Sequence, residues 1–190
     1  FGEANGPLPE GCEPLATLFR REHYATAAFT EGELRRDLDF GSGIEQGFEW
    51  FDGSYEAEEA GSQRTLDKAR DWMEEHRDRK FMLFLRVSEL ADMKVRKRYG
   101  TRFIDNADAP KDVNLYDTML EYVDTAVGSF VQHIRDTEFR KNTCVLLVSP
   151  YAMDFSAAGK LLPPGLSEDA LRVPMLYYEP GLPRETRTYI

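Results

Sequence analysis

Hydrophobic residues along this 190-residue chain follow two periodicities, one typical of helices and the other of strands. Apolar side chains recur at helical spacing over residues 14–23, 65–78 and 114–136. Short apolar runs at 24–30, 80–87, 143–149 and 173–178 predict strands. Helices and strands therefore alternate. This order implies right-handed βαβ crossovers and an α/β fold with a mainly parallel, doubly wound sheet and flanking helices.

Some segments carry more detailed expectations. The run at 80–87 is apolar throughout its centre, which predicts a strand covered on both faces. Residues 31–62 contain several glycines and are predicted to form a long irregular loop with 47–51 as a packed anchor. Ser167 precedes a short capped turn, and Pro174 suits a strand at the edge of a sheet. The helix at 114–136 carries two adjacent apolar stripes and should lie on a sheet.

Composition and charge restrict the classes of partner. Acidic residues outnumber basic ones by 34 to 24, which gives a net charge of -10. An acidic surface disfavours nucleic acid and anionic membranes, because phosphate binding needs a basic face. No apolar run reaches the ~20 residues of a membrane span, so none is predicted. The two cysteines cannot form a disulfide framework, and Cys144 is interpreted as a small core residue, so the cellular compartment stays open.

The strand at 143–149 leads into a loop at the position where α/β enzymes usually carry their chemistry. The first residues of that loop are Pro150, Tyr151, Ala152 and Met153. These side chains neither bind a metal ion nor transfer protons well. The pattern therefore suggests a fold that was retained after its reaction was lost.

Other residues that could carry chemistry are better explained structurally. The three histidines have no second histidine or cysteine at ligand spacing, so zinc is unsupported. Asp117 and Asp124 share a face of the long helix, where solvation is the simpler role. No glycine-rich phosphate loop follows a strand, and no GxSxG motif surrounds Ser149. Asp154 is interpreted as a turn or cap residue.

Five segments, in order, resemble the sulfatases of the alkaline phosphatase superfamily. They are residues 15–29 (LATLFRREHYATAAF), 47–52 (GFEWFD), 80–85 (KFMLFL), 116–128 (YDTMLEYVDTAVG) and 172–181 (RVPMLYYEPG). The resemblance implies one sulfatase-like α/β domain over residues 1–190, incomplete relative to the family. The family's first strand, with paired metal-binding aspartates, and its Cys/Ser-x-Pro-x-Arg nucleophile motif would lie upstream of Phe1. The family's C-terminal part would follow residue 190.

The same resemblance implies that the family's metal site is degenerate. Pro150 and Tyr151 stand where the family motif TSDHG has its Asp and His. Arg86 and Ala91 stand where histidines of FLHxxxPH are expected, and Ala158 stands at the histidine of DFGEHG. The family would use a divalent cation such as Ca²⁺ or Mg²⁺. For this chain the expectation is no catalytic residue, no metal ligand and no cofactor at these positions.

These observations favour a catalytically inactive sulfatase-like domain that serves as a structural or protein-interaction subunit, and they leave enzyme activity open. The partner would be another protein chain, or a missing part of the same polypeptide, that completes the sheet. The alternative is a fragment of a metal-dependent sulfuric or phosphoric ester hydrolase whose catalytic groups lie on missing segments. A third hypothesis is a module that binds sulfated or phosphorylated glycans, against which the acidic charge argues.

Overall fold

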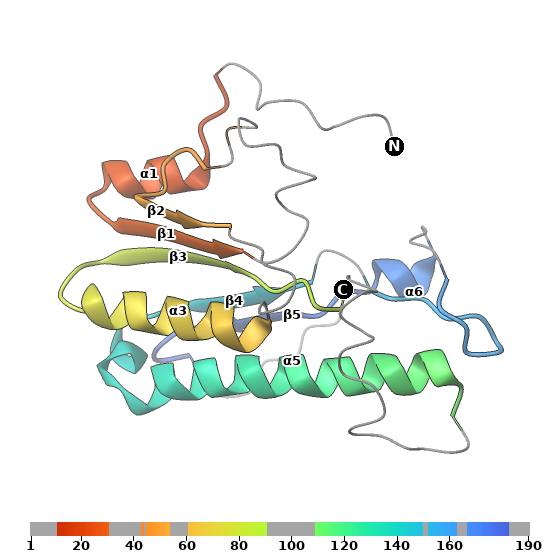
Figure 1. Cartoon of the computed structure of the whole chain (residues 1–190). Coiled ribbons are helices and arrows are strands. Elements are labelled where there is room, and N and C mark those ends of the chain that lie inside the picture. The colour runs from red at the N-terminus through yellow and green to blue at the C-terminus, as the bar shows by residue number, and fades with distance from the viewer. Residues whose placement is uncertain are drawn as a thin grey trace. The chain divides into compact units, whose positions relative to one another are not determined.

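The computed structural model describes residues 11–30, 43, 45–53, 61–90, 109–149, 152–162 and 167–182 (Figure 1). The chain divides into two compact units, Phe1–Gly100 with Met119–Phe130, and Thr101–Thr118 with Val131–Ile190. The elements are α1 (Leu15–Arg21), β1 (Ala25–Thr30), β2 (Trp50–Asp52), α3 (Ser62–Glu75), β3 (Phe81–Arg86), α5 (Lys111–Asp136), the 3₁₀ helix η1 (Glu138–Lys141), β4 (Val145–Val148), α6 (Glu168–Leu171) and β5 (Met175–Tyr178). The prediction of a single domain over residues 1–190 stays a prediction.

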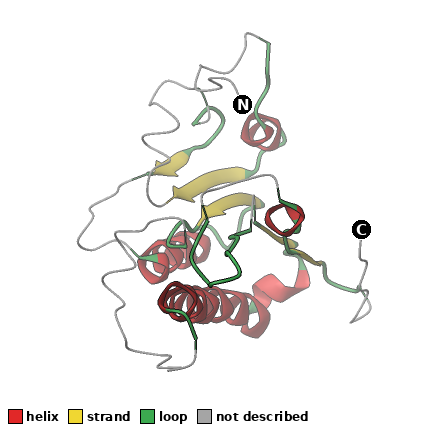
Figure 2. Cartoon of the chain, turned by 90° about the vertical axis from the view of Figure 1, so that its right-hand side faces the viewer, coloured by secondary structure: helices red, strands yellow, loops and turns green. Residues whose placement is uncertain are grey.

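The first unit contains a parallel three-stranded sheet in the order β2-β1-β3. The central strand β1 is buried along its whole length. Its three alanines are fully buried and leave room for helices to pack closely on the sheet. Helices α1 and α3 lie on opposite faces of this sheet (Figure 2). The predicted α/β class, with a parallel sheet and helices on both faces, is therefore confirmed for this unit.

Helix α3 packs through the apolar stripe that the sequence predicts. Leu66, Ala69, Trp72 and Met73 are all buried. The Trp72 ring meets Phe81 of β3 edge-on, with 6.2 Å between the ring centroids. The helix begins three residues before the predicted start because Gly61, in extended conformation, serves as its N-cap. The interior of this unit therefore lies between α3 and the sheet.

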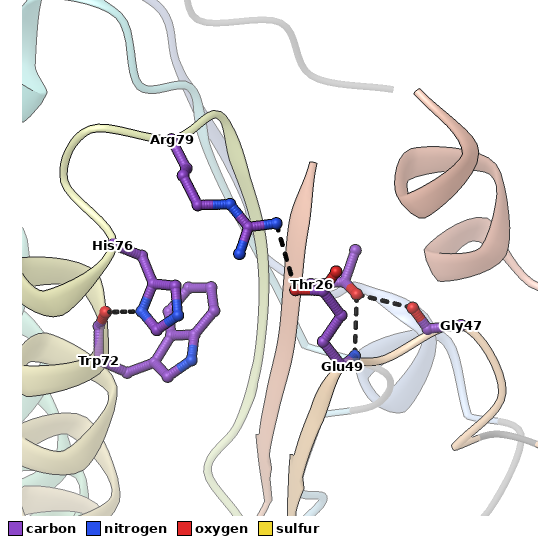
Figure 3. A network of polar contacts seen from close by, with 6 residues as sticks. All are labelled: Thr26, Gly47, Glu49, Trp72, His76 and Arg79. Atoms are coloured by element: carbon purple, nitrogen blue, oxygen red, sulfur yellow. Dashed lines mark hydrogen bonds and ion pairs between the residues drawn. The ribbon is translucent and has the colours of Figure 1, made fainter. Parts of the chain in front are cut away.

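Strand β2 lies inside the segment predicted to be an irregular loop. It pairs parallel to β1, with Ala27 opposite Trp50 and Ala28 opposite Phe51. The turn before it is fixed by Thr26, whose hydroxyl donates to the Gly47 carbonyl at 2.6 Å and accepts from the Glu49 N–H at 3.0 Å (Figure 3). Three residues are too few to display the alternation that identifies a strand, so the sequence gives no local sign of β2.

Strand β3 forms where it is predicted, but its burial differs from the expectation. Its residues are mostly half-buried, and the Phe84 side chain is 40% exposed. Among the described strands, β3 pairs only with β1, from Ala25 opposite Phe81 to Thr30 opposite Arg86. An apolar strand with one paired neighbour lacks the coverage that its composition predicts.

The second unit contains a two-stranded antiparallel sheet of β4 and β5, in which Val145 pairs with Tyr178 and Val148 with Met175. Helix α6 begins at the predicted cap, since the Ser167 hydroxyl accepts from the Ala170 N–H at 3.1 Å. Cys144 is exposed, so its interpretation as a core residue was wrong. Apolar neighbours in the sequence predicted burial, but Cys144 precedes a strand whose outward residues are themselves exposed.

Helix α5 contributes residues to both units. It begins three residues before the predicted start, after Pro110 at its N-cap. Met119, Ala126 and Phe130 of one predicted stripe are buried. In the other stripe Ile134 is buried and Leu120 is 42% exposed. Of the helices in the described segments, none combines the length and apolarity that a membrane span requires.

Candidate functional site

The structure describes two of the five positions at which the resemblance implies lost histidines or metal ligands. Arg86 is the last residue of β3, and Ala158 is exposed in a turn. Pro150, Tyr151 and Ala91 lie outside the described residues. The degenerate metal site at Pro150 and Tyr151 therefore stays a prediction.

The carboxyl ends of the three parallel strands bring polar residues to one edge of the sheet. Thr30 ends β1, Asp52 ends β2 and Arg86 ends β3. The register places Phe29 opposite Asp52 and Thr30 opposite Arg86, so these strand ends are neighbours. In open α/β sheets, ligands bind outside the carboxyl ends of the strands. This edge is therefore the candidate site of the first unit.

Two carboxylates near this edge have partners within the unit. The Lys68 ammonium of α3 lies 2.7 Å from the Asp52 carboxylate, and the Thr30 hydroxyl donates weakly to the Asp52 carbonyl at 3.5 Å. The Glu89 carboxylate is buried and accepts a hydrogen bond from the Ser62 hydroxyl. Because Ser62 is the first residue of α3, the helix dipole also favours the Glu89 charge at this end.

Arg86, unlike these two carboxylates, carries a buried polar atom for which the described residues provide no partner. This atom is Nη1 of the guanidinium, and it has no hydrogen-bond partner in the described part of the chain. The guanidinium carries donors only and keeps its charge in proteins. The site therefore contains a cationic donor that no described residue satisfies.

The segment with Ala158 belongs to the second unit and is fixed to the start of α5. Phe155 and Leu161 form an isolated antiparallel bridge. The Leu161 N–H donates to the Asp112 carboxylate at 3.1 Å, and Tyr116 meets Phe155 edge-on at 5.5 Å between centroids. Burial, followed by the nearby Asp117 charge, raises the pKa of Tyr116. These contacts position the backbone, and they leave Ala158 as a methyl group in an exposed turn.

The described residues do not fit a divalent cation. They contain no cluster of three or more His, Cys, Asp or Glu side chains with metal-binding geometry. A guanidinium at position 86 has no lone pair to donate, and the alanine at 158 has no donor atom at all. No reaction step through a metal can be derived from these residues.

The sequence did not single out the Asp52–Lys68 pair or the Ser62–Glu89 pair. Asp52 closes one of the segments that carry the resemblance, and this was the only signal available for it. Glu89 lies in a stretch interpreted as polar and irregular, and its burial depends on the packing of α3 against the end of β3. Neither pair has a spacing that a linear pattern can reveal.

Several solved structures are similar to this chain. The lipoteichoic acid synthase LtaP from Listeria monocytogenes has a TM-score of 0.69 and 16% identity, covering 89% of this chain and 47% of its own. An alkaline phosphatase superfamily protein from Vibrio parahaemolyticus has a TM-score of 0.63 and 16% identity, covering 96% and 44%. The C-terminal periplasmic domain of EcEptC from Escherichia coli has a TM-score of 0.65 and 12% identity, covering 88% and 51%.

At these identities the likeness shows the fold alone, and the chain spans only about half the length of each of these proteins. No curated protein sequence matches the chain. The Sulfatase family profile matches residues 1–189, nearly the whole sequence. The chain therefore belongs to the sulfatase family, within the alkaline phosphatase superfamily.

Proposed function

We propose that this chain is a catalytically inactive sulfatase-like domain that serves as a structural or protein-interaction subunit. The observation that carries the proposal is an apolar surface on the second unit. On the exposed face of the β4–β5 sheet, defined by Leu146, Val148, Met175 and Tyr177, every side chain is more than half exposed, between 55% and 64%. Pairs across the two strands make these four residues one continuous patch.

An apolar sheet face that is more than half exposed is costly in water and marks a surface that another polypeptide covers. The cover would be either another protein chain or a further part of the same polypeptide. Both would bury the four side chains and pair with the edges of β4 and β5 that no other described strand occupies. This surface supports an interaction role better than any chemistry available at the described residues.

The inactive part of the proposal is supported by side-chain chemistry. Hydrolysis of sulfate esters needs a metal ion or another electrophile at the ester oxygens, a nucleophile and a proton donor. Pro150 and Tyr151 replace the family's Asp and His, and Arg86 and Ala158 occupy histidine positions. Pro has no side-chain donor or acceptor, and tyrosine is a poor ligand for a hard dication. Several necessary groups are replaced together.

Incubation with aryl sulfate and aryl phosphate esters tests this part. The purified chain is assayed with Ca²⁺, Mg²⁺ or Mn²⁺, beside an active arylsulfatase as the positive control. We expect no metal-dependent turnover above that of buffer. Metal-dependent turnover that disappears in the Asp154→Asn variant, which alters the carboxylate in the described loop after β4, would sink the inactive assignment.

The second candidate is a fragment of a metal-dependent sulfuric or phosphoric ester hydrolase. The observation in its favour is that the chain spans only 44–51% of the length of the similar structures. The complete gene product distinguishes the two candidates. Turnover by the complete product that requires an additional segment with paired aspartates and a Cys/Ser-x-Pro-x-Arg motif would favour the hydrolase.

A further inference from the structure

The guanidinium of Arg86 is the starting point of this inference. It stands at the carboxyl end of β3, with its Nη1 atom buried and, among the described residues, without a hydrogen-bond partner. A buried charged donor without a partner is costly, and native structures supply such groups with a counter-charge or a bound ligand. The carboxyl edge of a parallel sheet is also where α/β proteins hold ligands.

The charged groups at the same edge do not serve Arg86. Asp52 is neutralised by Lys68 at 2.7 Å, and Glu89 accepts its hydrogen bond from Ser62. No ion pair joins Arg86 to either carboxylate among the described residues. The lysine is engaged as well, so among the described residues of this edge Arg86 is the cation left to meet an anion.

We propose that Arg86 binds a carboxylate group at the carboxyl edge of the β2-β1-β3 sheet. The planar guanidinium matches a carboxylate with two parallel N–H···O hydrogen bonds. The one cation available among the described residues of this edge balances one negative charge. A dianionic sulfate or phosphate would leave an unbalanced charge in a chain whose net charge is already -10. This site goes beyond the proposed function, because it lies in the first unit and needs neither the β4–β5 face nor catalysis.

Acetate is the probe for the site. Titration of the 190-residue chain with sodium acetate is followed by NMR of the arginine Nε–H groups and by calorimetry, at constant ionic strength. We expect saturable binding with millimolar affinity, because a single charge pair binds weakly. Sulfate at the same ionic strength should bind at least several-fold more weakly. Equal or tighter binding of sulfate would contradict the carboxylate assignment.

Variants of two arginines, one at the carboxyl end of β3 and one shortly before the strand begins, give the matched comparison. Arg86→Gln should weaken acetate binding at least tenfold, and Arg86→Lys should weaken it less, since lysine keeps the charge without the planar fork. Arg79→Gln is the control: Arg79 precedes β3, is exposed, and pairs with Glu49 at 3.4 Å (Figure 3). The control should bind acetate as the wild type does.

Circular dichroism checks that each variant is folded. If Arg86→Gln fails to fold, Arg86→Lys decides the question. Wild-type affinity in a folded Arg86→Gln or Arg86→Lys variant overturns the proposal. Absence of acetate binding to the wild type, or an equal loss in Arg79→Gln, also overturns it.

The carboxylate has two conceivable sources, a small free acid or an Asp or Glu side chain of a polypeptide. A capped peptide Thr-Val-Thr-Val-Asp and its Asn counterpart distinguish them. Binding of the Asp peptide at least tenfold tighter than acetate, lost in the Asn peptide and in Arg86→Gln, supports a polypeptide source. Equal affinities of acetate and the Asp peptide support a free acid. Equal binding of the Asp and Asn peptides overturns carboxylate recognition.

Discussion

At the residue scale, Gly47 fixes the approach of α1 to the turn that precedes β2. Its φ of +88° lies in the left-handed region, and an added Cβ would stand 2.2 Å from the Thr17 backbone nitrogen. Its carbonyl also receives the hydroxyl of Thr26 at 2.6 Å. Backbone atoms cannot move aside as the end of a side chain can. Glycine is therefore required here by conformation and by space together.

Alanine substitutions at three glycines separate these two effects. Gly47→Ala should lower the free energy of unfolding by about 2–4 kcal/mol, from left-handed strain and the clash together. Gly11 has a φ of +90°, but an added Cβ there would enter open space. Gly11→Ala should therefore lower the free energy of unfolding by about 1 kcal/mol or less. Gly128 lies inside α5, where an added Cβ would meet no described atom within 4 Å outside the adjoining helix backbone, so Gly128→Ala should raise the free energy of unfolding by about 0.5–1 kcal/mol. Urea unfolding measures all three; equal losses in Gly47→Ala and Gly11→Ala would contradict the steric contribution.

The hydrogen bonds of the Tyr177 hydroxyl predict a change in the free energy of unfolding at alkaline pH. Its hydroxyl donates to the Glu179 carboxylate at 3.0 Å, and this bond, followed by the bond with Cys144, raises the pKa of Tyr177 to about 12. An unfolded tyrosine titrates near pH ~10. The native state holds the hydroxyl proton more tightly than the unfolded state does. The resulting contribution of Tyr177 to the free energy of unfolding is therefore full below about pH 10, and it is lost as the pH rises through about 12.

The test is the ultraviolet absorbance of tyrosinate after rapid pH jumps. Glu179→Ala should move the titration of Tyr177 down toward the ordinary tyrosine range, because the acceptor is gone. Subtraction of the curve of Tyr177→Phe assigns the signal to this residue. An unchanged titration in Glu179→Ala would show that Glu179 does not hold the proton.

At the element scale, α3 shows how burial controls the contribution of a side chain to the free energy of unfolding. Met73→Ala removes a side chain that is 0% exposed, so a loss of about 2–5 kcal/mol in unfolding free energy is expected. The matched control is Met175→Ala, on the exposed face of the β4–β5 sheet and 64% exposed, which should change stability by less than about 0.5 kcal/mol. Denaturant unfolding of both variants checks the contrast, and comparable losses would mean that Met175 is covered in solution.

The elements also show what the sequence could and could not predict. The α3 stripe was predictable because helical spacing is a local property, and all four of its residues are buried. Strand β2 depends on the close approach of Gly47 to α1 and on pairing with β1, and both contacts join residues far apart in the sequence. The burial of β3, and of Cys144 beside β4, was overestimated because apolar composition indicates that a segment becomes covered, without saying by which other segment. At the candidate site, the resemblance predicted that Arg86 occupies a family histidine position, and this stays a prediction. The burial of its Nη1 atom depends on three-dimensional packing, which no linear pattern reveals.

At the scale of the whole molecule, both sheets end in apolar strands that lack full coverage. In the first unit, β3 pairs on one side among the described strands, and its Phe84 is 40% exposed. In the second unit, the exposed face of the β4–β5 sheet is uncovered. The similar structures are about twice as long as this chain. These observations together support the proposal that further polypeptide, from this chain or another, completes the fold.

Charge substitutions on the exposed face test this proposal. The double variant Leu146→Lys with Met175→Lys places two cations on the patch. We expect it to reduce self-association, measured by sedimentation velocity, and binding of an apolar fluorescent dye several-fold, because the patch loses its apolar character. Stability should change by less than about 0.5 kcal/mol, since both side chains are more than half exposed. The same double variant should fail to bind any natural partner that the wild type binds.

The control for this surface is Leu171→Lys. Leu171 is 62% exposed, like Leu146 at 61%, but it belongs to α6 and lies off the exposed face of the sheet. It should leave dye binding and partner binding close to wild-type values. If this variant lowers both as strongly as the double variant, the effect comes from added charge in general, and the β4–β5 face is not the surface that another polypeptide covers.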